Sequence, residues 1–262
     1  MSGTSISPIR VAIAVVGIGV IAVLALVATD YGSAADEPPE DARQVLFIGN
    51  SHTFYNDLPA MVERLANEDD DTEGIAVDEV TAGGASLGDH VGNPELERFV
   101  TDGAFDVVVI QANSVEPLID RQATIEDFRT LAAWSEEGGA QPVLYELWPR
   151  EQGSAIYEQP WAPDTQEEYA RLVQATSEDA VDQTGAHLAP VGRTWERSRR
   201  RATEIELYQE DGNHPTEAGT YLAALVIYAT IEDGLPDREL WGPPGIGEAD
   251  ANTLQELAGP GG

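Results

Sequence analysis

Short apolar runs alternate with longer amphipathic segments through the middle of the chain, and this alternation constrains the fold more than any other feature. The alternation predicts a parallel sheet, because each helix returns the chain to the same edge and covers one face. We expect one α/β domain of three layers, α/β/α, with a five-stranded parallel sheet. The expected strands are residues 45–48, 76–81, 107–111, 142–147 and 186–191, and the expected helices are 59–67, 125–136, 166–184 and 216–231.

A serine follows the first expected strand directly, in the sequence Gly49, Asn50, Ser51, His52, Thr53. A hydroxyl at the carboxyl end of a parallel strand points into the crevice where α/β sheets bind ligands, and it lies near the positive end of the next helix. This position suits a nucleophile. The same residue types are also ordinary in a turn and a helix N-cap, so the motif alone does not decide.

A second polar motif, from Asp211 to His214, precedes the last expected helix. On a turn that enters a helix, this spacing lets the carboxylate accept the Nδ1 proton of the imidazole, which leaves Nε2 free as a general base. The alternative interpretation is a polar turn that only caps the helix.

Together the two motifs resemble the SGNH (GDSL-like) hydrolase superfamily, over about residues 44–234. The resemblance implies a flavodoxin-like three-layer fold. It also implies that Ser51 is the nucleophile, that His214 is the base and that Asp211 orients it. No cofactor and no metal are implied, and the sequence has no cysteine and no metal-binding spacing of histidines.

Two further family blocks imply donors to an oxyanion besides the Ser51 amide: a glycine amide after the second strand and an asparagine side chain after the third. Gly84 best matches the glycine, with Gly83 and Gly88 as alternative registers, and Asn113 matches the asparagine. The block before it has Gln111 where the family has glycine.

The nucleophile block also departs from the family, with Asn50 in place of aspartate and His52 in place of leucine. Asn50 can still hold the turn through short side-chain hydrogen bonds. We expect His52 to be either a residue of the substrate cleft or a solvent-facing turn residue. His90 and His187 show no pattern of partners.

The function that these residues imply is a serine ester hydrolase, of the carboxylesterase, lipase or O-acetylesterase type, that forms an acyl-serine intermediate. Its substrate would be a small-molecule or glycan ester. One alternative is a catalytically silent extracellular domain that binds glycan, and another is an O-acyltransferase that acts on an envelope sugar. The oligomeric state is not indicated.

The chain carries a formal charge of −33, from 47 acidic residues against 14 basic ones, all of them arginine. Such self-repulsion opposes compactness and is screened by concentrated salt, so we expect a salt-adapted protein. The negative field argues against a nucleic-acid partner. Five arginines cluster over residues 193–201, where they either pair with carboxylates on a helical face or hold an anionic substrate near His214.

The remaining segments complete the expected organisation. Residues 1–30 contain an uncharged run, 11–28, which is long enough to span a membrane, so we expect a membrane anchor with the catalytic domain outside the cell. Cleavage near Ser33, which would release a secreted form, is the alternative. Residues 31–43 form an acidic linker, 44–242 the hydrolase domain, and 243–262 a Gly/Pro-rich tail in which we expect little regular structure.

A long loop over residues 148–161 follows the fourth expected strand and contains several aromatic residues. These aromatic side chains either line the substrate cleft or pack the loop against the domain.

Overall fold

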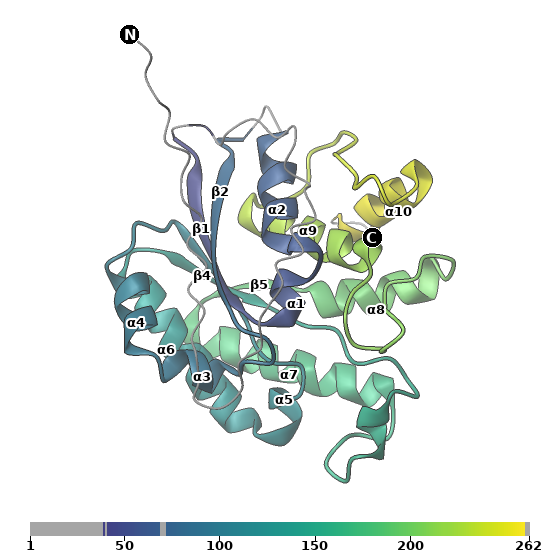
Figure 1. Ribbon diagram of the computed structural model, residues 1–262, viewed down its shortest axis with the longest axis horizontal. Helices are drawn as coiled ribbons and strands as arrows, with labels where there is room; N and C mark the ends of the chain where they lie inside the picture. Colours follow the sequence, from purple (N-terminus) through teal and green to yellow (C-terminus); the bar gives the residue numbers. More distant parts are fainter. Residues whose placement is uncertain (1–38, 40, 69–71, 260–262) are drawn as a thin grey trace.

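A parallel sheet of five strands lies at the centre of the protein (Figure 1). The computed structural model describes residue 39 and residues 41–68 and 72–259. The strand order is β2-β1-β3-β4-β5. The strands are β1 (Arg43–Gly49), β2 (Ile75–Thr81), β3 (Val107–Gln111), β4 (Gln141–Tyr145) and β5 (His187–Ala189). The prediction of a three-layer fold with five parallel strands is confirmed.

The two faces of the sheet are covered by different helices, because successive side chains of a strand point to opposite sides. In β1, Val45 and Phe47 belong to one core cluster and Leu46 and Ile48 to the other. The first cluster packs against α2 (Leu58–Asn67), α8 (Val191–Arg201), α9 (Glu217–Ile231) and α10 (Glu248–Ala258). The second packs against α3 (Leu87–Val91), α4 (Pro94–Thr101), α6 (Arg121–Glu137) and α7 (Gln166–Thr184) (Figure 1).

The strand order creates a switch point between β1 and β3. The chain leaves β1 toward β2 on one side and returns beside β1 as β3, so the loops that follow β1 and β3 diverge at the same edge of the sheet. Crevices at such a point are where open α/β sheets bind ligands. The segments that contain Ser51 and Asn113 begin there.

The predicted helices match α2, α6, α7 and α9 closely, but the predicted fifth strand was too long. β5 ends at Ala189, and Val191 already begins α8. α8 has no apolar stripe in the sequence, because its buried positions include Gly192, Thr194 and Ser198 as well as Trp195. The short helix α5 (Glu116–Ile119) and the 3₁₀ turns η1 (Tyr55–Asp57) and η2 (Ala155–Glu158) were also not predicted.

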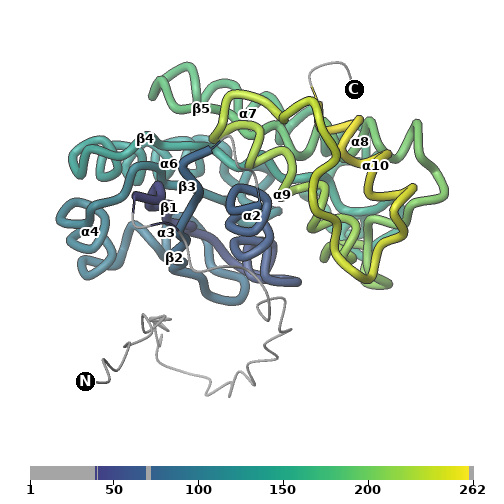
Figure 2. The backbone as a smooth tube through the Cα atoms, turned by 90° about the horizontal axis from the view of Figure 1, so that it is seen from above, coloured from purple at the N-terminus to yellow at the C-terminus, as the bar shows by residue number. Residues whose placement is uncertain are grey.

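The expectation of little regular structure over residues 243–262 was wrong, because residues 248–258 form α10. Ala251, Leu254 and Leu257 are buried and lie on one face of this helix. Gln255 adds two hydrogen bonds from its Nε2, to the Tyr221 hydroxyl at 2.8 Å and to the Leu240 carbonyl at 3.0 Å. Figure 2 shows α10 beside α8 and α9. The glycines and prolines of this segment lie before and after the helix in the sequence and do not interrupt it.

The predicted membrane anchor, residues 1–30, lies outside the described residues. Among the residues that are described, none of the helices combines the length and the apolar character needed to cross a bilayer.

If α10 is part of the domain core, Leu254→Ala should lower the free energy of unfolding by about 2–5 kcal/mol, since Leu254 is fully buried against α9. Urea unfolding at fixed salt measures this. Glu256→Ala, an exposed change on the same helix, should alter it by less than about 0.5 kcal/mol. Equal losses of unfolding free energy in the two variants would contradict a core role for α10.

Candidate active site

The nucleophile candidate Ser51 is the first residue of α1 (Ser51–Phe54), immediately after β1. Asn50 caps this turn: its Oδ1 accepts the His52 amide at 3.1 Å, and its Nδ2 donates to the Ala85 carbonyl at 2.9 Å. Asn50 therefore fixes the turn and also ties it to the loop after β2, a role that suits an amide better than the aspartate of the family motif.

Glycine is required at position 49, where the chain passes close to its neighbours. A Cβ there would lie 2.3 Å from Thr53 Oγ1 and 2.6 Å from Gln111 Oε1. The close approach at Gly49 brings Gln111 against the serine turn. Its Oε1 accepts hydrogen bonds from the Asn50 amide at 2.9 Å and from the Thr53 hydroxyl at 2.8 Å. His90 lies within 2.9 Å of the Gly49 carbonyl through Nε2. Gln111, which departs from the family motif, thus supports the serine turn.

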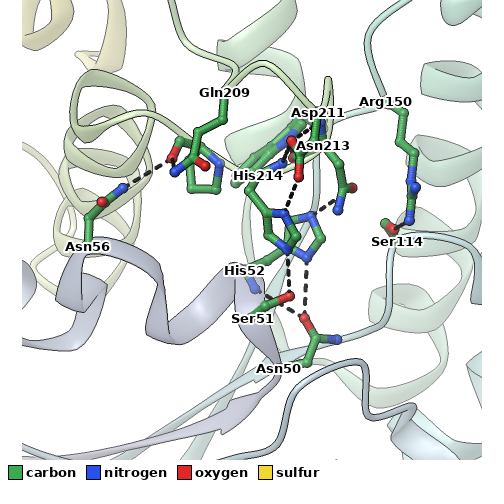
Figure 3. Close-up of polar contacts among 12 residues, drawn as sticks. Asn50, Ser51, His52, Asn56, Ser114, Arg150, Gln209, Asp211, Asn213 and His214 are labelled. Carbon is green, nitrogen blue, oxygen red and sulfur yellow. Dashed lines mark hydrogen bonds and ion pairs between the residues drawn. The ribbon is translucent and has the colours of Figure 1, made fainter. Parts of the chain in front are cut away.

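Ser51, His214 and Asp211 lie in a hydrogen-bonded series (Figure 3). His214 Nε2 is 2.9 Å from Ser51 Oγ, and His214 Nδ1 is 2.5 Å from Asp211 Oδ2. The other carboxylate oxygen of Asp211 accepts the backbone amides of Asn213 and His214, each at 2.9 Å. Asp211 therefore holds both the ring and the backbone of the histidine.

The Asp211 carboxylate is ionised at neutral pH. Burial acts to raise its pKa, but the hydrogen bonds from His214 and Asn213 outweigh burial, and the pKa is lowered from its usual value. An ionised carboxylate can only accept at Nδ1, so the His214 proton lies on Nδ1. Nε2 is then the acceptor that faces the Ser51 hydroxyl.

The His214 ring is also held from its faces. Tyr55 stacks on it with ring centroids 4.2 Å apart and planes 10° apart, and the His52 ring lies 5.3 Å away on a plane tilted by 27°. Tyr55 is presented by an unusual turn, because the next two residues, Asn56 and Asp57, both have left-handed backbone with φ near 50°. Tyr55 belongs to no sequence motif and was not predicted.

The turn after Tyr55 is anchored to the start of α9. Asn56 Nδ2 donates to Thr220 Oγ1 at 2.8 Å. It also donates to the Pro215 carbonyl at 3.1 Å (Figure 3). Two consecutive non-glycine residues with positive φ are costly, so they persist only where surrounding contacts hold them. These two hydrogen bonds provide such contacts next to His214.

His52 does not face solvent, so that expectation for it was wrong. Its side chain is buried and lies between two asparagines, with Nδ1 3.2 Å from Asn50 Oδ1 and Nε2 3.2 Å from Asn213 Oδ1 (Figure 3). Burial, followed by the nearby His214, lowers the pKa of His52 to about 3, so its ring is neutral. His52 thus connects the serine turn to the loop that carries the catalytic histidine candidate.

The neutral His52 ring has one N–H, which settles the direction of its hydrogen bonds. The Asn50 amide is oriented by the Ala85 carbonyl, so its oxygen faces His52 and Nδ1 must carry the proton. Nε2 is then an acceptor, and Asn213 satisfies it when its amide is turned so that the NH₂ group faces the ring. Asn213, also missed in the sequence, is the neighbour of Nε2, with Oδ1 at 3.2 Å.

The candidate oxyanion donors lie on the three loops that follow β1, β2 and β3. Asn113 Nδ2 donates to the Gly84 carbonyl at 2.9 Å, which leaves its second hydrogen available. Gly84 has φ +72°, a conformation that glycine adopts without strain. Across the described residues, the backbone N–H groups of Ser51 and Gly84 have no hydrogen-bond acceptor. Gly83 does not contact Asn113 by a hydrogen bond, and Gly88 lies within α3.

Glu116 joins two of these loops. One carboxylate oxygen accepts the Asn113 amide at 2.5 Å and the other accepts the Leu87 amide at 2.9 Å. Burial raises the pKa of Glu116 to about 7, although both backbone hydrogen bonds act to lower it. The residue therefore changes charge near neutral pH at the base of the candidate oxyanion site, and no sequence motif marked it.

Three arginines of the cluster over residues 193–201 (Arg193, Arg199 and Arg200) pair with carboxylates, as the first of the two expectations stated, and of these carboxylates only Glu196 lies on α8. Arg193 contacts Glu146 and Glu178, each at 3.0 Å, and Arg199 contacts Glu196 at 3.2 Å. The cluster forms no described contact with His214. Among the residues the structure describes, no group of three or more acidic or histidine side chains is placed to hold a metal ion.

The loop over residues 148–161 is anchored to the domain by its first aromatic residue. Trp148 is buried, stacks on Trp195 with centroids 3.9 Å apart, and donates from Nε1 to the Asn213 carbonyl at 3.0 Å. Trp161, farther along, is 40% exposed. The loop therefore packs at one end and presents an aromatic side chain to solvent at the other.

Comparison with solved structures identifies proteins of the same fold. The chain is 30% identical to a candidate SGNH hydrolase from Slackia heliotrinireducens, with a TM-score of 0.64, and the match covers 72% of this chain and 99% of that one. A DUF4886 family protein from Bacteroides uniformis is 18% identical, with a TM-score of 0.66 and coverage of 83% and 93%. An acetylxylan esterase from Geobacillus stearothermophilus is 15% identical, with a TM-score of 0.53 and coverage of 75% and 95%.

Searches of protein-family models and of curated proteins give no match. The identity to the Slackia protein over nearly its whole length nevertheless shows the family, and the chain belongs to the SGNH hydrolases. The predicted family is therefore confirmed, and with it the prediction of a hydrolase that acts on ester bonds.

The raised pKa of Glu116 predicts a pH-dependent stability. The folded state keeps a proton on Glu116 up to about pH 7, whereas the unfolded chain loses it near 4.5. This contribution to stability is full below pH 4.5 and is lost as the pH rises through 7. Glu116→Gln should remove that fall, so its unfolding free energy should decline less than that of the wild type between pH 5 and 7.

Urea unfolding at several pH values measures this difference. Glu136→Gln, an exposed change on α6, is the matched control and should retain the wild-type slope. The assignment would be refuted if Glu116→Gln and wild type lost stability equally across this interval.

Proposed function

We propose that the chain is a serine ester hydrolase in which Ser51, His214 and Asp211 act as nucleophile, general base and orienting carboxylate. One observation carries the proposal: the Nε2 atom of a histidine lies 2.9 Å from a serine hydroxyl while its Nδ1 atom lies 2.5 Å from a carboxylate. This is the geometry by which a weakly nucleophilic hydroxyl is activated. The position of Ser51 at the carboxyl edge of β1 supports the same role.

In the first half of the reaction, Ser51 Oγ attacks the ester carbonyl carbon as its proton passes to His214 Nε2. The imidazolium that forms is stabilised by Asp211, whose carboxylate stays ionised. The carbonyl oxygen becomes an anion, and the amides of Ser51 and Gly84 with Asn113 Nδ2 are the proposed donors to it. His214 then protonates the leaving alcohol as the ester bond breaks, which gives an acyl-serine.

In the second half, water attacks the acyl-serine and gives a proton to His214. The proton returns to Ser51 Oγ as the carboxylic acid leaves, so the enzyme is restored without a cofactor. An acceptor alcohol in place of water would convert the same steps into acyl transfer. The residues serve both outcomes equally, and hydrolysis is the proposal because the family is one of hydrolases.

The proposed substrates are carboxylic esters of a small-molecule or glycan alcohol, as for a carboxylesterase, a lipase or an O-acetylesterase. The fold is shared with an acetylxylan esterase, which supports including acetyl esters among the first substrates tested. We also propose that residues 1–30 anchor the protein in the cell membrane with this domain outside. That proposal is supported by the uncharged run 11–28 alone.

The proposed mechanism predicts that the purified full chain hydrolyses p-nitrophenyl esters in a series from acetate to palmitate. Ser51→Ala should abolish turnover of every ester, because no acyl-serine can form. The series ranks the acyl lengths that the site accepts. If the folded wild type is inactive toward all of them, or if Ser51→Ala retains activity, then the proposal fails.

Asn113→Ala should lower kcat by about 100- to 1000-fold with a smaller change in KM, because its amide is proposed to act on charge that develops only in the transition state. Steady-state kinetics on the best p-nitrophenyl ester measure this. Asn252→Ala, which removes an amide from α10, should keep wild-type kinetics. A change confined to KM would assign Asn113 to ground-state binding instead.

A further inference from the structure

Arg150 lies between the loop that carries Asn113 and the loop that carries His214. Its side chain extends toward Ser114, and Nη2 is 3.3 Å from Ser114 Oγ (Figure 3). The backbone around it is fixed to the second loop, because Trp148 Nε1 donates to the Asn213 carbonyl and the Glu151 amide donates to the Gly212 carbonyl at 2.8 Å. The guanidinium therefore lies at the border of the proposed catalytic site.

Among the described residues this guanidinium has no acidic partner, although the chain contains 47 acidic residues and 14 arginines. Five other partly buried arginines form ion pairs with carboxylates: Arg43, Arg64, Arg121, Arg193 and Arg199. Arg197 donates to the Leu257 carbonyl near the C-terminus of α10 at 2.7 Å. Within the described part of the chain, no carboxylate oxygen lies within 4.0 Å of the Arg150 nitrogens.

The groups that do surround Arg150 are neutral. Ser114 offers a hydroxyl, and the neighbouring Tyr169 is a buried phenol whose pKa burial raises to about 12, so it is not ionised at neutral pH. His52, which Arg150 also influences, is neutral. The Nε atom of Arg150 is buried with no hydrogen-bond partner among the described residues. A partly desolvated guanidinium without an anion is costly, and its planar fork matches a carboxylate in two hydrogen bonds.

We propose that Arg150 binds a carboxylate carried by the substrate, so that the site selects esters with an acidic group beside the scissile bond, such as an acetylated uronic acid. This inference rests on the proposed ester hydrolysis and names its substrate class. The attraction is local and acts against the overall charge of −33. The positive charge lies against Ser114, the residue that follows Asn113.

The test compares matched pairs of esters that differ in one negative charge. The first pair carries the charge on the alcohol side, as 4-acetoxybenzoate against 4-acetoxybenzamide. The second pair carries it on the acyl side, as mono-4-nitrophenyl glutarate against 4-nitrophenyl hexanoate. Rates are measured on the full chain in about 1 M salt, where the Debye length is about 3 Å and the field of distant carboxylates is screened.

Arg150→Gln should lower kcat/KM for the anionic member of at least one pair by about tenfold more than for its neutral member, the loss expected for a charge-assisted hydrogen bond. Arg150→Lys, which keeps the charge without the fork, should recover part of the difference. Arg129→Gln removes the same charge from an exposed site on α6. It should leave the ratio of anionic to neutral kcat/KM unchanged in both pairs. Circular dichroism establishes that each variant is folded.

The proposal is overturned if wild type and Arg150→Gln have the same ratio of anionic to neutral kcat/KM in both pairs. If kcat/KM falls equally for both members, Arg150 only supports Ser114. If Arg150→Gln does not fold, the Arg150→Lys ratio decides between these outcomes. Failure of the hydrolase proposal looks different, because the neutral esters would then not be turned over by the wild type in a Ser51-dependent way.

Discussion

The parallel pairing of β1 with both β2 and β3 is the constraint on which the rest of the site depends. It brings three loops to one edge of the sheet: the Ser51 turn, the Gly84 loop and the Asn113 loop. Side chains then tie the loops to one another, since Asn50 donates to Ala85, Asn113 donates to Gly84, and Glu116 accepts from both Asn113 and Leu87. Each contact joins a side chain to the backbone, so the spacing of the loops does not depend on contacts between two flexible side chains.

The histidine reaches this edge from the other end of the chain, and a second group of contacts fixes its approach. His52 connects Asn50 to Asn213, Trp148 holds the Asn213 carbonyl, and Tyr55 covers the His214 ring. The low pKa of His52 suits this role, because a second charged imidazole beside His214 would oppose formation of the imidazolium. Leucine, the usual residue in the family motif at this position, could not make either hydrogen bond.

The sequence predicted the sheet, four of the long helices and the three residues of the hydrogen-bonded series, because each has a local signal: apolar periodicity, or polar residues directly after a strand or before a helix. It did not predict Tyr55, Asn213 or Glu116, since their roles depend on neighbours distant in the chain. It missed α10 because glycine and proline dominate the residues before that helix, and only the docking of Leu254 against α9 makes the helix stable. His52 was misjudged for the same reason, as its partner Asn213 lies 161 residues away.

The separation of Ser51 from His214 in the chain also orders the events of synthesis. Ser51 and its strand leave the ribosome before His214, α9 and α10 do. The contacts that orient His214 include Asn56 against Thr220 and His52 against Asn213, and each joins an early segment to a late one. An incomplete chain therefore has the hydroxyl without the base, and under the proposed mechanism the nascent protein cannot attack an ester until nearly all of the domain has been translated and folded.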